Sequence, residues 1–173
     1  SREVSIGQLQ RDGFESEGVA ERWLGQQKSQ RVFLFLHLYE PHKPYAPPVR
    51  YAEYDPYDGE IAYVDEIVGK LVRYLKTHQL YDRSTIILVS DHGEGLGDHG
   101  EQEHGLFLYD EAIRVPLIIK QAGGVGAGRR IPDLVQHVDL FELHRVERHA
   151  VVGVVEPDLD PVRSDEQRVV GKV

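Results

Sequence analysis

Two short runs of the chain are apolar at nearly every position. They are residues 32–38 (VFLFLHL) and residues 85–90 (TIILVS). Runs of this length and composition predict strands that are buried on both faces, as in a parallel sheet covered by helices. A third run, residues 114–120 (RVPLIIK), predicts another strand.

Between the first two runs, the apolar residues change to steps of three and four. This spacing predicts a helix with one apolar face from Glu60 to about His78. The residues that form this face are Ile61, Val64, Val68, Leu71, Val72 and Leu75. A shorter amphipathic helix is predicted over residues 17–28, and residues 105–113 are expected to be partly helical. A helix between two buried strands is typical of a βαβ unit, so the sequence predicts an α/β fold.

The segment between the first strand and the long helix contains prolines at positions 41, 44, 47, 48 and 56. Proline interrupts both helices and strand pairing, so a long ordered loop is predicted here, and such loops are often functional. Residues 131–143 are expected to form a short strand followed by a helix. Residues 144–173 have no steady period, and we predict no structure for this tail.

Length, composition and charge limit the classes of protein to which this chain can belong. The chain has 173 residues, 40% of them hydrophobic, which suits a single domain with an ordinary core. No apolar run approaches the roughly 20 residues of a membrane span. The net charge of -9 argues against a nucleic-acid-binding surface, because such surfaces need clustered lysine and arginine. The absence of methionine suggests a piece of a longer protein, and the absence of cysteine excludes disulfides and thiol chemistry in this piece.

Residues 91–111 combine seven of the 29 acidic residues with three histidines and no lysine or arginine. A block of this kind is either a solvated loop or a cation site. Asp91 and His92 directly follow the strand at residues 85–90, and in α/β sheets ligands bind at the carboxyl ends of strands. Carboxylate and imidazole are also ligands for divalent ions. In the alternative interpretation, Asp91 caps a helix or a turn and four further acids are solvated, namely Glu94, Asp98, Glu101 and Glu103.

A second polar cluster, PHKPY at residues 41–45, follows the first strand. If the two strands are adjacent and parallel, both loops meet at one edge of the sheet. His42, Lys43 or His104 could there neutralise an anionic substrate beside the metal pair. In the alternative interpretation, His42 only packs against Tyr45 within the proline loop.

Together these residues resemble the sulfatase family of the alkaline phosphatase superfamily. The resemblance runs from about Val32 to Phe141, through the segments FLFLHLYEPHKPY, YDGEIAYVDEIVGKLVRYL, STIILVSDHGEGLGDHGEQEHGLFLYDEAIRVPLII, GAGRR and VQHVDLF. It implies a mixed, largely parallel sheet sandwiched by helices, alkaline phosphatase-like and incomplete in this chain. Residues 1–143 would form a partial catalytic domain, and residues 144–173 a divergent tail.

The resemblance also implies roles for individual residues. Asp91 and His92 correspond to metal ligands, for an ion that is usually Ca²⁺, with Mn²⁺, Mg²⁺ and Zn²⁺ as alternatives. His42 corresponds to a histidine that contacts the sulfate ester oxygens. His104 stands where many members have a lysine near the leaving-group oxygen, so His42 and His104 are the expected catalytic residues, and both bind substrate together with Lys43.

Family members attack sulfur with a formylglycine made in a CxPSR-like segment, and neither this segment nor an early Asp-Asp pair occurs in the chain. We therefore expect a segment of a metal-dependent sulfuric ester hydrolase, acting on a small-molecule or glycan sulfate ester only with the missing N-terminal half of the domain. The alternatives are a phosphonate or phosphate ester hydrolase, a phosphoethanolamine transferase, or a non-catalytic remnant.

Overall fold

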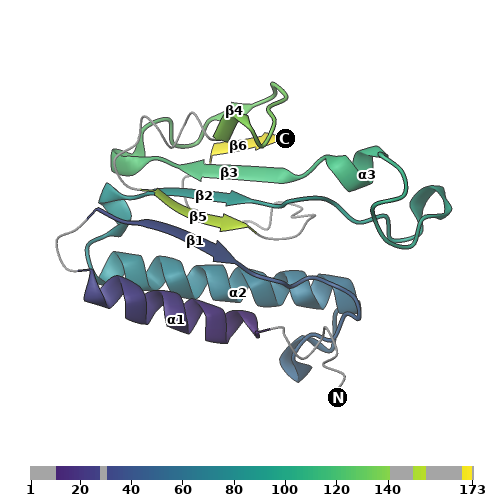
Figure 1. The fold of residues 1–173 in the computed structure, drawn as a ribbon, viewed down its shortest axis with the longest axis horizontal. Helices are drawn as coiled ribbons and strands as arrows, with labels where there is room; N and C mark the ends of the chain where they lie inside the picture. The colour runs from purple at the N-terminus through teal and green to yellow at the C-terminus, as the bar shows by residue number, and fades with distance from the viewer. Residues whose placement is uncertain (1–10, 28–30, 141–149, 155–168, 173) are drawn as a thin grey trace, which may run out of the picture.

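The computed structural model describes residues 11–27, 31–140, 150–154 and 169–172, and these residues form one mixed α/β fold (Figure 1). Its six-stranded sheet has the order β1-β5-β2-β3-β6-β4. The strands are β1 (Phe33–His37), β2 (Thr85–Val89), β3 (Pro116–Lys120), β4 (Arg130–Ile131), β5 (Ala150–Val154) and β6 (Val169–Lys172). β1, β5 and β2 run parallel, whereas β3 is antiparallel to both β2 and β6. β4 pairs in parallel with β6.

Two long helices, α1 (Gly13–Gln26) and α2 (Pro56–Thr77), lie side by side along the sheet (Figure 1). α2 begins four residues before the predicted start at Glu60. The reason is local, because the Asp55 side chain accepts a hydrogen bond from the Tyr57 backbone N–H at 3.3 Å and Pro56 occupies the first turn. The spacing of apolar residues, from which the start at Glu60 was predicted, gives no information about this capped first turn. The short helix α3 (Asp110–Ile113) lies in the segment that was predicted to be partly helical.

Both long helices pack on the same face of the sheet. Leu36 of β1 and Ile67 and Leu75 of α2 lie in one buried cluster, which Ile86 and Leu88 of β2 extend. On the opposite face, a smaller cluster forms around β2 and β3. Its members are Ile87, Val89, Val115 and Leu117, with Ile119, Val135 and Leu140 packed against them. Among the described residues, helices therefore cover one face, and the irregular segment at residues 132–140 packs on the other.

The prediction that the first strand is buried on both faces is wrong. Phe33 and Phe35 of β1 point away from the helices and are 50% and 57% exposed. An apolar run shows that both faces of a strand are apolar, but it does not show that both are covered. β2 fits its prediction better, because alternate residues are buried and the others are partly buried.

β1 and β2 are parallel, as the βαβ prediction requires, but they are not adjacent. β5 lies between them and pairs with both. This central strand comes from the tail for which no structure was predicted, and so does β6. The carboxyl ends of β1 and β2 still lie at the same edge of the sheet. The last residues of the helix expected near the end of residues 131–143 lie outside the described residues, which stop there at Leu140.

Helices in the described part of the chain are too short or too polar to cross a membrane.

Candidate active site at the carboxyl edge of the sheet

The loops that follow β1 and β2 meet, as the sequence predicts. Lys43, from the first loop, donates from Nζ to the Gln102 carbonyl oxygen at 2.8 Å. The same ammonium lies 3.3 Å from Glu103 Oε1. Residues 41–45 and residues 90–105 thus form one polar surface. Lys43 belongs to this surface, with its charge paired to Glu103 at a partly exposed position.

Hydrogen bonds hold the backbone of the segment directly after β2, which carries Asp91 and His92. Ser90 is fully buried, and its hydroxyl donates to the His92 carbonyl oxygen at 2.6 Å. His137 Nε2 lies 2.7 Å from the Ser90 carbonyl oxygen, and since a carbonyl only accepts, this nitrogen carries the hydrogen. The segment at residues 132–140 therefore supports the backbone that leads into Asp91 and His92 from the second face of the sheet.

The side chains of Asp91 and His92 converge. His92 Nδ1 lies 2.9 Å from the Gly93 carbonyl oxygen and must donate to it, which leaves Nε2 as the nitrogen with a lone pair. That Nε2 lies 3.8 Å from Asp91 Oδ2. Two ligands of one divalent ion, at bond lengths of about 2.0–2.6 Å, lie about 3–3.7 Å apart, so the pair fits a shared cation after a small adjustment.

Asp91 and His92 alone would supply only part of a metal ligand set. Within the part of the chain that the structure describes, no three His, Asp or Glu side chains are grouped closely enough to hold an ion. Divalent ions take at least four ligands in proteins. Asp91 and His92 therefore fit the group that the resemblance implies, as two ligands of a larger shell.

The other two predicted histidines lie beside this pair. The His104 ring stacks on the His92 ring, with centroids 3.8 Å apart and an interplanar angle of 30°. The His42 ring meets His104 edge-on at 6.3 Å. The His42 ring also packs on the Tyr39 ring of the same loop, with centroids 4.3 Å apart. Three imidazoles thus form a row along the carboxyl edge of the sheet.

The interpretation that all four distal acids are solvated is wrong for two of them. Glu94 and Glu101 are only 8% and 7% exposed, whereas Asp98 and Glu103 are exposed. The loop folds back on itself, because Gly95 N donates to the Glu103 carbonyl oxygen at 3.1 Å. A Cβ at Gly95 would lie 2.5 Å from that oxygen. The close spacing of glycines in the sequence was the available signal for this tight fold.

Glu60 organises the first loop and was missed at the sequence level. Its buried carboxylate accepts hydrogen bonds from His42 N at 3.0 Å and from Ala46 N at 2.7 Å. Burial raises the pKa of the Glu60 carboxyl, and the two backbone donors only partly oppose this rise. The available signal was spacing, since Glu60 lies four residues before Val64 on the face that α2 buries.

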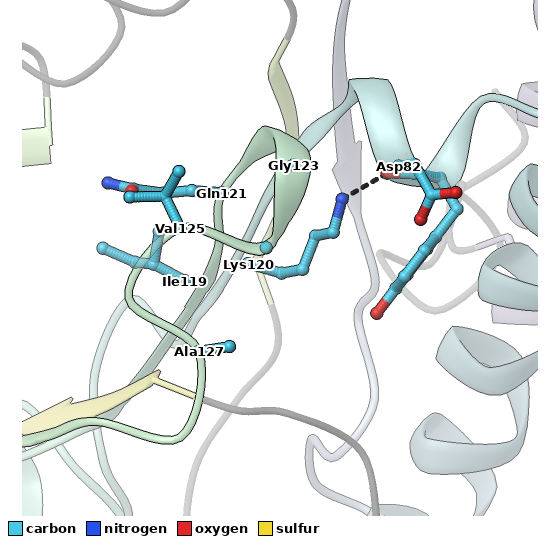
Figure 2. Close-up of a pocket in the computed structure, with 9 residues that line it drawn as sticks. Asp82, Ile119, Lys120, Gln121, Gly123, Val125 and Ala127 are labelled. Atoms are coloured by element: carbon cyan, nitrogen blue, oxygen red, sulfur yellow. Dashed lines mark hydrogen bonds between the residues drawn. The ribbon is translucent and has the colours of Figure 1, made fainter.

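A separate pocket of about 160 Å³ lies at the other edge of the sheet (Figure 2). It is lined by Tyr81, Asp82, Ile119, Lys120, Gln121, Gly123, Gly124, Val125 and Ala127. Lys120 Nζ donates to the carbonyl oxygens of Tyr81 and, at 2.9 Å, Ser84, and it lies 4.4 Å from the Tyr81 ring. Burial lowers the pKa of Lys120. With its ammonium engaged by these groups, Lys120 joins the start of β2 to the end of β3, away from the histidine row.

Comparison with known proteins identifies the family. The family model described as Sulfatase matches residues 17–143. Phosphoethanolamine transferase EptA of Salmonella typhimurium is 41% identical over 66 residues, which are 36% of this chain and 12% of that protein. N-acetylglucosamine-6-O-sulfatase of Bacteroides thetaiotaomicron is 35% identical over 83 residues, which are 48% of this chain and 15% of that protein.

The multifunctional alkaline phosphatase superfamily protein PehA of Trinickia caryophylli is 43% identical over 68 residues, 39% of this chain and 13% of that protein. No solved structure matches the chain significantly. The matched segments thus span only 12–15% of the length of these curated relatives. The family match covers more than half of the chain and includes both site loops, and the chain belongs to the sulfatase family of the alkaline phosphatase superfamily.

Proposed function

We propose that this chain is a segment of a metal-dependent sulfuric ester hydrolase and supplies half of its active site. The observation that supports this most is the convergence of Asp91 and His92 beside the row of His42 and His104. One edge of the sheet thus offers cation ligands and several groups that can bind a sulfate oxygen. Both features suit a small, anionic ester.

Each residue has a distinct role in this proposal. Asp91 Oδ2 and His92 Nε2 hold the divalent ion, for which Ca²⁺ is the first candidate and Mn²⁺, Mg²⁺ or Zn²⁺ are alternatives. When bound, the ion withdraws charge from the sulfate oxygens. His42 and Lys43 bind the anionic ester. His104, when protonated, donates a proton to the leaving alcohol, which is chemistry suited to imidazole at neutral pH.

The attacking group lies outside the present sequence in this proposal. A formylglycine nucleophile requires a CxPSR-like segment, and the chain has no such segment. The remaining metal ligands and the nucleophile then belong to the N-terminal half of the same catalytic domain. We accordingly expect the 173-residue chain to bind a metal weakly and to have little or no sulfatase turnover.

A second candidate function is phosphoethanolamine transfer or hydrolysis of a phosphate or phosphonate ester. The identity to EptA and to PehA favours it, because both exceed the identity to N-acetylglucosamine-6-O-sulfatase. The same metal pair and histidines would serve all of these reactions. The nucleophile distinguishes them, since CxPSR would favour a sulfatase or phosphonate hydrolase and a threonine nucleophile would favour a transferase. The DNA upstream of the codon for Ser1 provides this test.

Calorimetric titration of the purified chain with Ca²⁺ and Mn²⁺ tests the metal site directly. We expect weak binding that is lost in Asp91→Ala and kept in Asp98→Ala, a matched change at an exposed acid of the same loop. No binding by the unaltered chain would favour a non-catalytic remnant. Rapid hydrolysis of p-nitrophenyl sulfate by this chain, abolished in Asp91→Ala, would refute the placement of the nucleophile outside it.

A further inference from the structure

We propose that Glu94 is the positioning residue of His104. Its buried carboxylate accepts the Nδ1 hydrogen of His104 and thereby directs Nε2 toward the edge where substrate binds. The role of His104 in catalysis rests on the proposed function. The pairing of Glu94 with His104 rests on the contacts alone, and it can be tested without turnover.

Glu94 is held from several sides. Its side chain is 6% exposed. Tyr45 donates its hydroxyl hydrogen to Oε2 at 2.8 Å, and the Gly95 N–H donates to Oε1 at 3.2 Å. His104 Nδ1 lies 3.3 Å from Oε1, at the long end of the hydrogen-bond range. A buried carboxylate requires donors, and these three groups supply them.

The contacts decide which nitrogen of His104 carries the hydrogen. An ionised carboxylate only accepts hydrogen bonds, so Nδ1 must be the donor. Neutral imidazole has one N–H, which leaves Nε2 to bind a substrate proton or, after protonation, to donate one. Glu94 would in this way set the direction of proton transfer by His104.

Two independent contacts fix the His104 ring. Stacking on His92 at 3.8 Å fixes the ring plane, and Glu94 fixes the rotation within that plane. A flipped ring would present a carbon atom to Oε1 and leave the Gly95 N–H as the one donor to that oxygen within the described part of the chain, so it would lose a hydrogen bond to a charged group. Tyr45 extends this arrangement to the first loop, so both site loops contribute to the position of one imidazole.

Glu101 provides a matched control. It is buried to the same degree in the same loop, and its carboxylate accepts from the Leu106 backbone N–H at 2.9 Å. A change at Glu101 therefore removes a buried carboxylate and a loop hydrogen bond without removing the contact to His104. An effect confined to Glu94 would identify positioning rather than general support of the loop.

The experiment is ¹⁵N NMR of the histidine rings in the full 173-residue chain. Spectra are recorded at an alkaline pH at which the ring signals no longer change as the pH is raised, so that only neutral tautomers are compared. The His104 signals are identified by their loss in His104→Gln. Backbone amide signals of β2 report whether each variant is folded.

We expect His104 to populate mainly the Nδ1–H tautomer. In Glu94→Ala the ratio of tautomers should shift by about tenfold, the order expected when a hydrogen bond to a charged group is removed. Glu94→Gln keeps the side-chain volume and one acceptor oxygen, so it should fold and keep part of the preference. Glu101→Ala should leave the ratio unchanged.

An unchanged ratio in Glu94→Ala with wild-type β2 amide signals would overturn the proposal, as would an equal shift in Glu101→Ala. If Glu94→Ala does not fold, a complete absence of any shift in folded Glu94→Gln would also overturn it. The proposed ester hydrolysis fails by a different result, because a chain that binds no metal would still give these tautomer signals.

Discussion

Replacement of Glu60 by alanine tests whether a residue remote from the metal pair holds the first site loop in place. The Glu60 side chain joins α2 to the loop through the backbone N–H groups of His42 and Ala46. In Glu60→Ala both donors lose their buried acceptor. Each such loss costs about 1–3 kcal/mol, but the change also removes the burial cost that raises the pKa of this carboxyl. We therefore expect a net loss of about 2 kcal/mol at pH 7.

Urea denaturation measures this loss. For a slope of about 2 kcal/mol per molar urea, the midpoint should fall by about 1 M. Hydrogen exchange should also accelerate at the amides of His42 and Ala46 and not at those of β2. Asp65→Ala, an exposed change on the same helix, serves as the control and should stay within about 0.5 kcal/mol of wild type. A Glu60→Ala variant with the control's stability and unaltered exchange at both amides would refute the reasoning.

Two further predictions concern packing. Burial raises the pKa of Glu17 from its ordinary 4.5 to about 7, although the neighbouring Lys70 ammonium lowers it. Between these two pH values the folded chain therefore binds a proton that the unfolded chain releases. The free energy of unfolding should thus fall by up to about 3 kcal/mol as pH rises from about 4.5 to about 7. Urea midpoints measured across this window should decrease with pH in the unaltered chain and lose this pH dependence in Glu17→Gln. A Glu17→Gln variant that keeps the pH dependence would contradict the assignment. A Cβ at Gly93 would lie 1.8 Å from the Glu111 carbonyl oxygen, so Gly93→Ala should destabilise the chain by about 3 kcal/mol, because backbone cannot easily move aside. At Gly18 the nearest atom to an added Cβ is 3.5 Å away on a flexible side chain, so Gly18→Ala should instead stabilise α1 by up to about 1 kcal/mol. Equal shifts of the urea midpoint in Gly93→Ala and Gly18→Ala would refute the steric explanation.

The elements that sequence reasoning recovered are those with a local cause. The apolar face of α2 repeats every three to four residues, and β2 is a short run of β-branched residues between turns, so each is recognisable from its own letters. The meeting of the two site loops also followed from local information, since parallel strands place their carboxyl ends at one edge.

The features that were missed depend on distant partners. β5 is five residues long, and it pairs with β1 and β2, which are more than 60 residues earlier in the chain. Glu94 and Glu60 are acids in polar surroundings of the sequence, and only the folded chain brings donors from other segments to their carboxylates. The spacing of Glu60 to Val64 indicates the helix face on which Glu60 lies, but neither acid's hydrogen-bond donors can be predicted from the residues around it.

β1 combines an apolar outer face with a position at the end of the sheet. In the order of the strands it is terminal, so one of its backbone edges has no strand beside it among the described residues. Phe33 and Phe35 on that strand are half exposed. An edge of this kind is a template for strand addition and, in isolation, for self-association. The purified chain is therefore expected to self-associate as its concentration rises. In the proposed function, the N-terminal half of the domain could add a strand at this edge, beside the strand that leads into His42.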